Sequence, residues 1–137
     1  MALQFVPHPG TVLICDYDLG RSASMPFEMT KRRPVVVISP HRRTHLRPYL
    51  VIPFSTQVPA LPGPTHHRIL AGSYDFLSSA RDSWAKCELV SAVDTQRLDR
   101  LLYRGCYLAA RLTAADLLGI RLGVIHALGV GGFLTAM

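Results

Sequence analysis

The chain has 137 residues, of which 49% are hydrophobic, and its formal net charge is +6. This is the size of one ordinary domain with a hydrophobic core, and it argues against extended disorder. The sequence contains no apolar run of about 18 residues, as a membrane-spanning helix needs, and no secretory signal pattern at its start. Its three cysteines are widely spaced, which favours reduced thiols over a disulfide framework. We therefore expect a soluble, cytoplasmic protein with no membrane association.

Short β-strands are expected through the first two thirds of the chain. Apolar, β-branched runs bounded by Pro, Gly and polar clusters predict strands over 11–18, 33–40, 48–55, 66–70 and 84–93. Polar or Pro-rich segments predict loops over 19–32, 41–47 and 59–64, and a loop or helical turn over 73–82. Pro53 lies inside the third strand, where it implies an edge, a bulge or a bend.

The last third of the chain predicts helices. A helical turn begins at Asp94, with Leu98, Leu101 and Leu102 on one side. A longer helix spans 113–129, starting with a Thr113–Asp116 capping pair and ending at Gly129. Its core face is formed by Leu117, Ile120, Val124 and Leu128. We expect one domain over 1–137, with its core at about 9–129 and a mobile tail at 130–137.

Basic residues gather in one window of the sequence. No acidic residue occurs between Glu28 and Asp75, and arginine outnumbers lysine 13 to 2 over the whole chain. The planar guanidinium suits phosphate groups, so a polyanionic partner is indicated, either nucleic acid or an acidic protein segment. The alternative is a merely basic, solvated surface. The cations of this window are Lys31, Arg32, Arg33, Arg42, Arg43, Arg47 and Arg68.

Three segments couple an apolar run to polar side chains: 31–40, 49–57 and 84–94. They supply cations, hydroxyls, and an acid beside a base, which can bind a phosphodiester and move its protons without a metal or other cofactor. The candidates are Arg32, Arg33, Ser55, Thr56, Lys86 and Glu88.

Each candidate has a chemical role and a simpler alternative. Arg33 would stabilise charge on phosphorus, and Ser55 would hydrogen-bond a phosphate oxygen. Lys86 and Glu88 are two residues apart on the expected strand and share one face, so Glu88 could act as base and Lys86 as proton donor. The alternatives are a solvated strand start, strand-end capping and an exposed ion pair.

The histidines and cysteines do not suggest a metal site or a thiol nucleophile. His66 and His67 are adjacent and point to opposite faces of a strand, so they cannot readily share a metal ion. Cys87 lies between Lys86 and Glu88 and would therefore face the core.

The order of these motifs resembles the MazF/PemK (Kid) family of toxins from bacterial toxin–antitoxin systems, from about Pro9 to about Leu101. The residues that carry it are GTVLICDYD, RRPVVVISP, VIPFST and KCELVSAVD. The resemblance implies a mainly β (α+β) fold, an SH3-like antiparallel barrel of the CcdB/Kid/MazF type with a C-terminal helix. It also implies a homodimer and a metal-independent endoribonuclease that cleaves single-stranded RNA through its 2′-hydroxyl. A cognate acidic antitoxin would neutralise it.

The resemblance also assigns residues. Arg33 falls on the family's catalytic arginine, Ser55 on a catalytic Thr/Ser, and Lys86-Cys87-Glu88 on an Arg-Cys-Asp triplet with acid and base roles. Thr56 falls on a hydroxyl neighbour, and Glu28 falls on a loop glutamate. The expected RNA-binding residues are Glu28, Arg32, Arg42, Arg43, Arg47 and Thr56.

Two departures from the family pattern leave other functions open. Phe27 replaces a loop histidine and Ser91 a strand arginine, which keeps a catalytically silent, RNA- or protein-binding member as an alternative. A CcdB-like toxin that binds gyrase without cleaving anything is the other alternative. That relative uses a tryptophan near its C-terminal end, whereas the only tryptophan here is Trp84.

Overall fold

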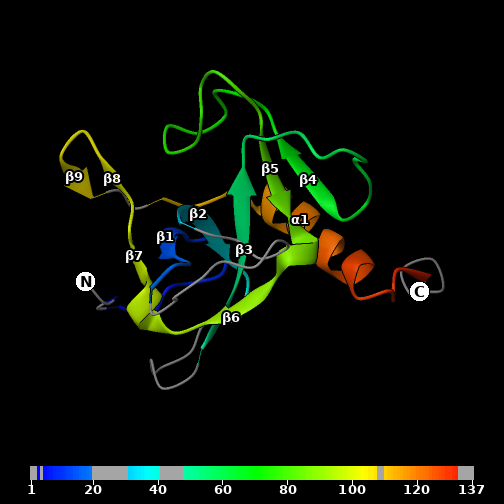
Figure 1. The fold of residues 1–137 in the computed structure, drawn as a ribbon, viewed down its shortest axis with the longest axis horizontal. Coiled ribbons are helices and arrows are strands. Elements are labelled where there is room, and N and C mark those ends of the chain that lie inside the picture. Colours follow the sequence, from blue (N-terminus) through cyan, green and yellow to red (C-terminus); the bar gives the residue numbers. More distant parts are fainter. Residues whose placement is uncertain (1–2, 4, 20–30, 41–47, 108–109, 133–137) are drawn as a thin grey trace.

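The computed structural model describes residues 3, 5–19, 31–40, 48–107 and 110–132 (Figure 1). The strands are β1 Val12–Asp16, β2 Arg32–Val37, β3 Tyr49–Ser55, β4 His66–Ile69, β5 Ser83–Lys86, β6 Ser91–Val93, β7 Leu98–Arg100, β8 Leu102–Tyr103 and β9 Cys106–Tyr107. The helices are the short 3-10 helices η1 Cys87–Leu89 and η2 Thr95–Arg97, and the α-helix α1 Ala114–Ala127.

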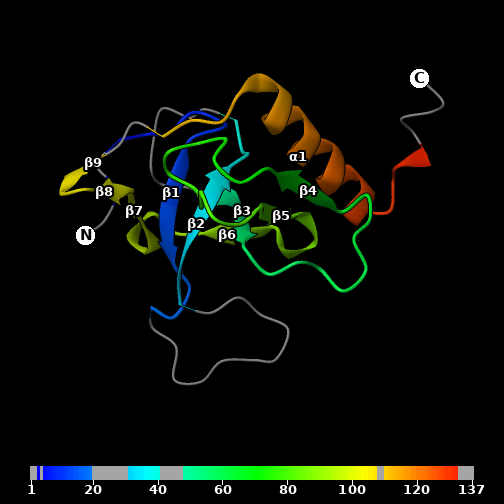
Figure 2. The same ribbon diagram turned by 90° about the horizontal axis from the view of Figure 1, so that it is seen from above.

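One antiparallel sheet forms the body of the protein. Its strands follow the order β4-β5-β3-β2-β1-β7, and β6 also pairs with β3. Figure 2 shows α1 lying along one side of this sheet, near β4 and β5. The predicted fold class, a small antiparallel β structure with a C-terminal helix, is confirmed. None of the helices in the described part of the chain has the length and hydrophobicity of a transmembrane span.

The sheet has a hydrophobic cluster on each face, which explains the unbroken apolar run of β2. Val35 and Val37 pack with Tyr49 in one cluster, while Val36 packs with Ile52 in the other. All three valines are fully buried. Strands covered on both faces need apolar side chains at successive positions instead of the usual alternation.

Pro53 marks a change of partner in the middle of the sheet, not an edge. On one side of β3, Tyr49 to Val51 pair with β6, whereas Phe54 and Ser55 pair with β5. Pro53 lies between these two ladders and stands opposite Val35 of β2 on the other side. Proline has no N–H to donate to a neighbouring strand. At this gap between the two ladders, the missing hydrogen bond destabilises the sheet least.

The strand predicted over 84–93 is wrong as a single element. β5 ends at Lys86, η1 follows, and β6 begins at Ser91. The break lies where α1 comes close: a Cβ at Gly123 would stand 2.6 Å from the Cys87 sulfur. The backbone N–H of Cys87 donates to the Thr65 carbonyl at 3.0 Å, which extends the register of β4 and β5 by one residue before the chain enters η1.

The segment after Asp94 is partly as predicted. Asp94 caps η2, where its carboxylate accepts the Gln96 N–H at 2.9 Å. The shared leucine face is wrong, because Leu98 already belongs to β7, which pairs with β1. Leu98 and Leu101 enter different clusters, and Leu102 is 62% exposed.

A hairpin of β8 and β9 was not predicted. Its two-residue turn is Arg104-Gly105, with φ angles of 50° and 80°, as a type I′ turn requires. Figure 1 shows this hairpin projecting away from the body of the sheet.

The predicted C-terminal helix is confirmed, with one error in its buried face. Thr113 caps it by accepting the Asp116 N–H at 3.2 Å, and Gly129 follows with φ 75°. Ile120 is fully buried, but Leu128 is 66% exposed. The predicted loop segment 20–30, the basic turn 41–47 and the tail segment 133–137 lie outside the described residues.

Candidate functional site

A pocket of about 220 Å³ lies where β2 begins and β3 ends. Because the two strands are antiparallel neighbours, these ends meet at one edge of the sheet. The pocket is lined by Arg32, Arg33, Pro34, Phe54, Ser55, Thr56, Phe76, Leu77, Ser78 and Ser83. Four of the residues predicted from the sequence are therefore brought together: Arg32, Arg33, Ser55 and Thr56.

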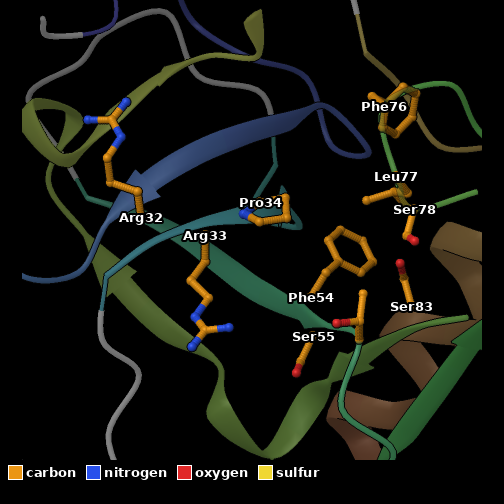
Figure 3. Close-up of a pocket in the computed structure, with 10 residues that line it drawn as sticks. Arg32, Arg33, Pro34, Phe54, Ser55, Phe76, Leu77, Ser78 and Ser83 are labelled. Atoms are coloured by element: carbon orange, nitrogen blue, oxygen red, sulfur yellow. The ribbon is translucent and has the colours of Figure 1, made fainter. Parts of the chain in front are cut away.

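Arg33 and Ser55 share one face of the sheet. Val35 stands opposite Pro53, and each of these residues lies two positions from Arg33 or Ser55 along its strand. Side chains two apart on a strand point to the same face. Figure 3 shows the Arg33 guanidinium and the Ser55 hydroxyl directed to the same side. Arg32 points the other way, and its guanidinium lies 3.9 Å from the Asp16 carboxylate.

The Ser55 hydroxyl is oriented by the turn that follows it. Its oxygen accepts the backbone N–H of Gln57 at 3.1 Å, so the strand-end capping expected as the simpler alternative is present. The same bond leaves the hydroxyl proton able to donate to a bound anion. Capping and ligand binding are therefore compatible in this side chain.

Arg33 is held half-buried at the start of β2. Its strand neighbour Cys15 stands opposite it, and Tyr17 lies in the same face of the sheet. Burial raises the pKa of Tyr17 well above its ordinary value, and the nearby Arg33 charge partly offsets this effect. Lys31, directly before β2, has a φ of 68°, a conformation that non-glycine residues rarely adopt outside constrained sites.

The opposite wall of the pocket comes from the loop between β4 and β5, which is tied to α1. The Tyr74 hydroxyl donates to Asp116 and accepts the Thr113 N–H at 3.0 Å. His67 Nε2 lies 2.8 Å from the same carboxylate. Partial burial raises the pKa of Asp116, but hydrogen bonds from Tyr74 and His67 outweigh it and keep that pKa below its usual value. This network anchors the loop just before Phe76.

The predicted acid and base do not line this pocket. Lys86 is the last residue of β5, on the same face as Trp84, and it stands opposite His66 of β4. Glu88 lies beyond the strand in η1, so the prediction that Lys86 and Glu88 share one strand face is wrong. The two residues are placed beside the pocket rather than in its wall.

Sequence reasoning missed His66 as the partner of Glu88. The Glu88 Oε1 and His66 Nε2 atoms are 3.2 Å apart. His66 Nδ1 accepts the Gly63 N–H at 3.2 Å, so the ring proton is assigned to Nε2 and donates to Glu88. The two residues are 22 positions apart, and only the pairing of β4 with β5 brings them together.

The other residues weighed for chemistry have structural roles. Cys87 is buried as expected, and burial raises the pKa of its thiol to about 12, which makes it a poor nucleophile. His66 and His67 contact different partners, as their opposite directions predicted. Across the part of the chain described here, no group of three metal-binding side chains occurs. Four predicted RNA-binding residues lie outside the described residues: Glu28, Arg42, Arg43 and Arg47.

Comparisons with known proteins agree with this fold. An endoribonuclease from a Mycobacterial species is 19% identical over 92% of this chain and 94% of its own, with a TM-score of 0.60. MazF from Deinococcus radiodurans is 17% identical over 92% of this chain and 99% of its own, with a TM-score of 0.64. A Mycobacterial endoribonuclease in complex with its cognate antitoxin is 21% identical over 90% of this chain and 96% of its own, with a TM-score of 0.60.

A comparison with curated protein sequences gives no match. The model of one family, described as the PemK-like, MazF-like toxin of type II toxin–antitoxin systems, matches residues 8–117. This range contains every element from β1 to β9 and the start of α1. The chain therefore belongs to the family of PemK-like, MazF-like toxins of type II toxin–antitoxin systems.

Proposed function

We propose that this protein is the toxin of a toxin–antitoxin pair and acts as a metal-independent endoribonuclease on single-stranded RNA. The observation that carries the proposal is that Arg33 and Ser55, from two neighbouring strands at the edge of this pocket, direct their side chains to the same side of the sheet. A guanidinium and a hydroxyl side by side suit the phosphate group of a polynucleotide. Two solved structures of this fold carry the name endoribonuclease, which supports the same assignment.

The reaction needs three groups. A base removes the proton of the 2′-hydroxyl, whose oxygen attacks phosphorus. The 5′-oxygen leaves and takes a proton from an acid, which gives a 2′,3′-cyclic phosphate and a 5′-hydroxyl. Arg33 stabilises the negative charge that builds up on phosphorus. Ser55 donates its hydroxyl proton to a non-bridging oxygen.

Glu88 and Lys86 are the proposed base and acid, with His66 holding the base in place. In β3 and β5, Ser55 stands opposite Trp84, and Lys86 is the next residue of β5 on that face. Lys86 therefore lies on the strand next to the one that carries Ser55. His66 stands opposite Lys86 and contacts Glu88. Hydrogen bonding from His66 Nε2 orients the Glu88 carboxylate, as a base in such a reaction requires.

Glu88→Gln should lower the cleavage rate by about 10²- to 10⁴-fold, the usual contribution of a general base. The Gln amide oxygen can still accept from His66, so the geometry is kept while the basic group is lost. RNA binding should be equal or tighter, because a negative charge is removed. Single-turnover cleavage and filter binding of the same RNA measure the two quantities.

Asp99→Asn is the matched control, since Asp99 lies on β7 at the far edge of the sheet from β4 and β5. It removes the same charge and should leave cleavage unchanged. Wild-type cleavage should also persist in EDTA and give cyclic phosphate ends. Loss of cleavage in EDTA, restored by a divalent metal, would refute the mechanism, and a fully active Glu88→Gln protein would remove Glu88 from it.

We further propose a two-fold homodimer and an acidic antitoxin that covers the basic face. The α1 helix exposes Leu118 at 58% and Leu122 at 37%, apolar area that a dimer could bury. A solved relative in complex with its cognate antitoxin supports the second partner. The net charge of +6 favours an acidic, initially disordered segment.

Antitoxin and RNA should compete, and the affinity of each should fall as salt rises, because both partners are anionic. A labelled RNA displaced by the antitoxin between about 50 and 200 mM salt checks both points. Sedimentation at micromolar concentration should show a dimer. A monomer there, or an antitoxin that binds without displacing RNA, contradicts this arrangement.

A further inference from the structure

A second pocket adjoins the phosphate site through a shared residue, Thr56. Its volume is about 500 Å³, and its lining includes Thr56, Gln57, Arg81 and Trp84. This volume is in the range of small-molecule binding sites and is larger than one phosphate group would fill. The pocket therefore has room for a larger, flat group bound beside that phosphate.

Trp84 stands next to the phosphate site by strand register. It is paired with Ser55 across β3 and β5, and directly paired side chains of antiparallel strands have Cβ atoms about 4.5–5.5 Å apart. A group that contacts the Trp84 ring is thus one strand away from the Ser55 hydroxyl. In a polynucleotide, the group at that distance from a phosphate is the base of an adjoining nucleotide.

The indole presents carbon atoms, not its N–H, to the pocket. The Trp84 Nε1 atom is buried, and no acceptor within the described residues lies at hydrogen-bonding distance. Its contribution to a ligand is therefore the face or edge of the ring. Aromatic rings that bind single-stranded nucleic acid do so by stacking on bases, which every base permits.

The ring is held in position before any ligand arrives. The Arg68 guanidinium lies over it, 5.7 Å from the ring centroid. Arg68 Nε in turn donates to Asp82 at 2.7 Å, and Asp82 also accepts the Ala71 N–H at 2.8 Å. A fixed ring loses little freedom on binding, which favours affinity.

Polar groups at the same pocket can read a base. Gln57 carries an amide donor and acceptor, and Arg81 carries a guanidinium, and both side chains are exposed. Unstacked bases in single-stranded RNA are read by such groups on their hydrogen-bonding edges. Stacking on Trp84 would supply affinity, and Gln57 and Arg81 would supply selectivity.

We propose that this pocket is a nucleobase subsite, in which Trp84 stacks on a base of the nucleotide adjoining the phosphate held by Arg33 and Ser55. This inference rests on the proposed nuclease function for the position of the phosphate. The ligand class is single-stranded nucleic acid, and the subsite selects the base next to the cleaved bond.

Trp84 is the only tryptophan in the chain, so its emission reports this pocket alone. The probe is a pool of randomised 2′-deoxy heptanucleotides, which have no 2′-hydroxyl to react. Binding is followed by anisotropy of a label on the probe and by Trp84 emission of the wild-type protein. We expect the emission to be quenched at the same probe concentrations at which anisotropy rises.

Trp84→Ala should weaken probe binding about 5- to 150-fold, the range that base stacking on aromatic residues gives. Trp84→Phe keeps a ring and should lose less, and it also guards against a fold defect in the alanine variant. Tyr107→Ala is the matched control: Tyr107 also has an arginine over its ring, Arg100 at 4.2 Å, but lies in the β8–β9 hairpin. Its affinity should equal that of the wild type.

Cleavage of randomised RNA by the wild type separates this inference from the nuclease proposal. Quenching without cleavage would overturn the nuclease and leave a nucleotide site. A different result would overturn the subsite and leave the nuclease. In it, the wild type cleaves RNA and binds the probe without a change in Trp84 emission, and Trp84→Ala binds the probe with full affinity. Relaxed base preference at one position beside the cut in Gln57→Ala or Arg81→Ala would support the subsite directly.

Discussion

Arg33→Ala should lower kcat/KM for RNA cleavage by at least about 10²–10³-fold, the loss seen when one preorganised charge-stabilising group is removed from an active site. The guanidinium is half-buried beside Ser55 and aimed to the same side of the sheet. Its loss leaves the charge on phosphorus without this cation. Growth arrest on induction should disappear in parallel.

The fold should survive this change, because Arg33 stands at the start of β2, outside both hydrophobic clusters. The urea midpoint is therefore expected to stay close to that of the wild type. Arg33→Lys keeps the charge but loses the planar fork, so it should recover only part of the rate.

The adjacent arginine, Arg32, tests whether any loss of positive charge at this end of β2 would have the same effect. Arg32→Ala removes the same charge one residue away, but Arg32 points to the other side and lies 3.9 Å from Asp16. Its loss should weaken RNA binding modestly and in a salt-dependent way, with little change in kcat. Equal losses in Arg32→Ala and Arg33→Ala, or a folded Arg33→Ala protein with full toxicity, would contradict the assignment.

The position of Arg33 and Ser55 could be predicted because it follows from local signals. Prolines and polar clusters mark the ends of both strands, and strands that follow one another in the chain usually lie beside one another in a sheet. The start of one strand and the end of the next then meet at one edge. The register that puts both side chains on one face follows from the same pairing.

The surroundings of Glu88 could not be predicted in this way. Read alone, residues 84–93 form one continuous strand pattern. The break at Cys87 arises because α1 approaches so closely at Gly123, 36 positions later in the chain. The contact of Glu88 with His66 likewise depends on the pairing of β4 with β5. Packing between segments far apart in the chain cannot be predicted from the sequence of one short segment.

The orientation of α1 is a third limit, because the helix is apolar on nearly every side. Its charged or titratable residues are Asp116, Arg121 and His126. An amphipathic stripe orients a helix only when the opposite side is polar. The sequence spacing therefore assigns both Ile120 and Leu128 to the core face, although the structure buries only Ile120.

These two residues give the largest expected effect on stability and its control. Ile120 is fully buried in the cluster that contains Cys87 and Phe54, so Ile120→Ala should lower the free energy of unfolding by about 2–5 kcal/mol. Leu128→Ala removes a side chain of the same size that is 66% exposed, and it should change that free energy by no more than about 0.5 kcal/mol. Urea unfolding at equal protomer concentration measures both, since any dimer makes stability depend on concentration. If the two substitutions cost the same, α1 packs with a different face than the structure gives; if only Ile120→Ala is costly, the close approach at Gly123 orients the helix.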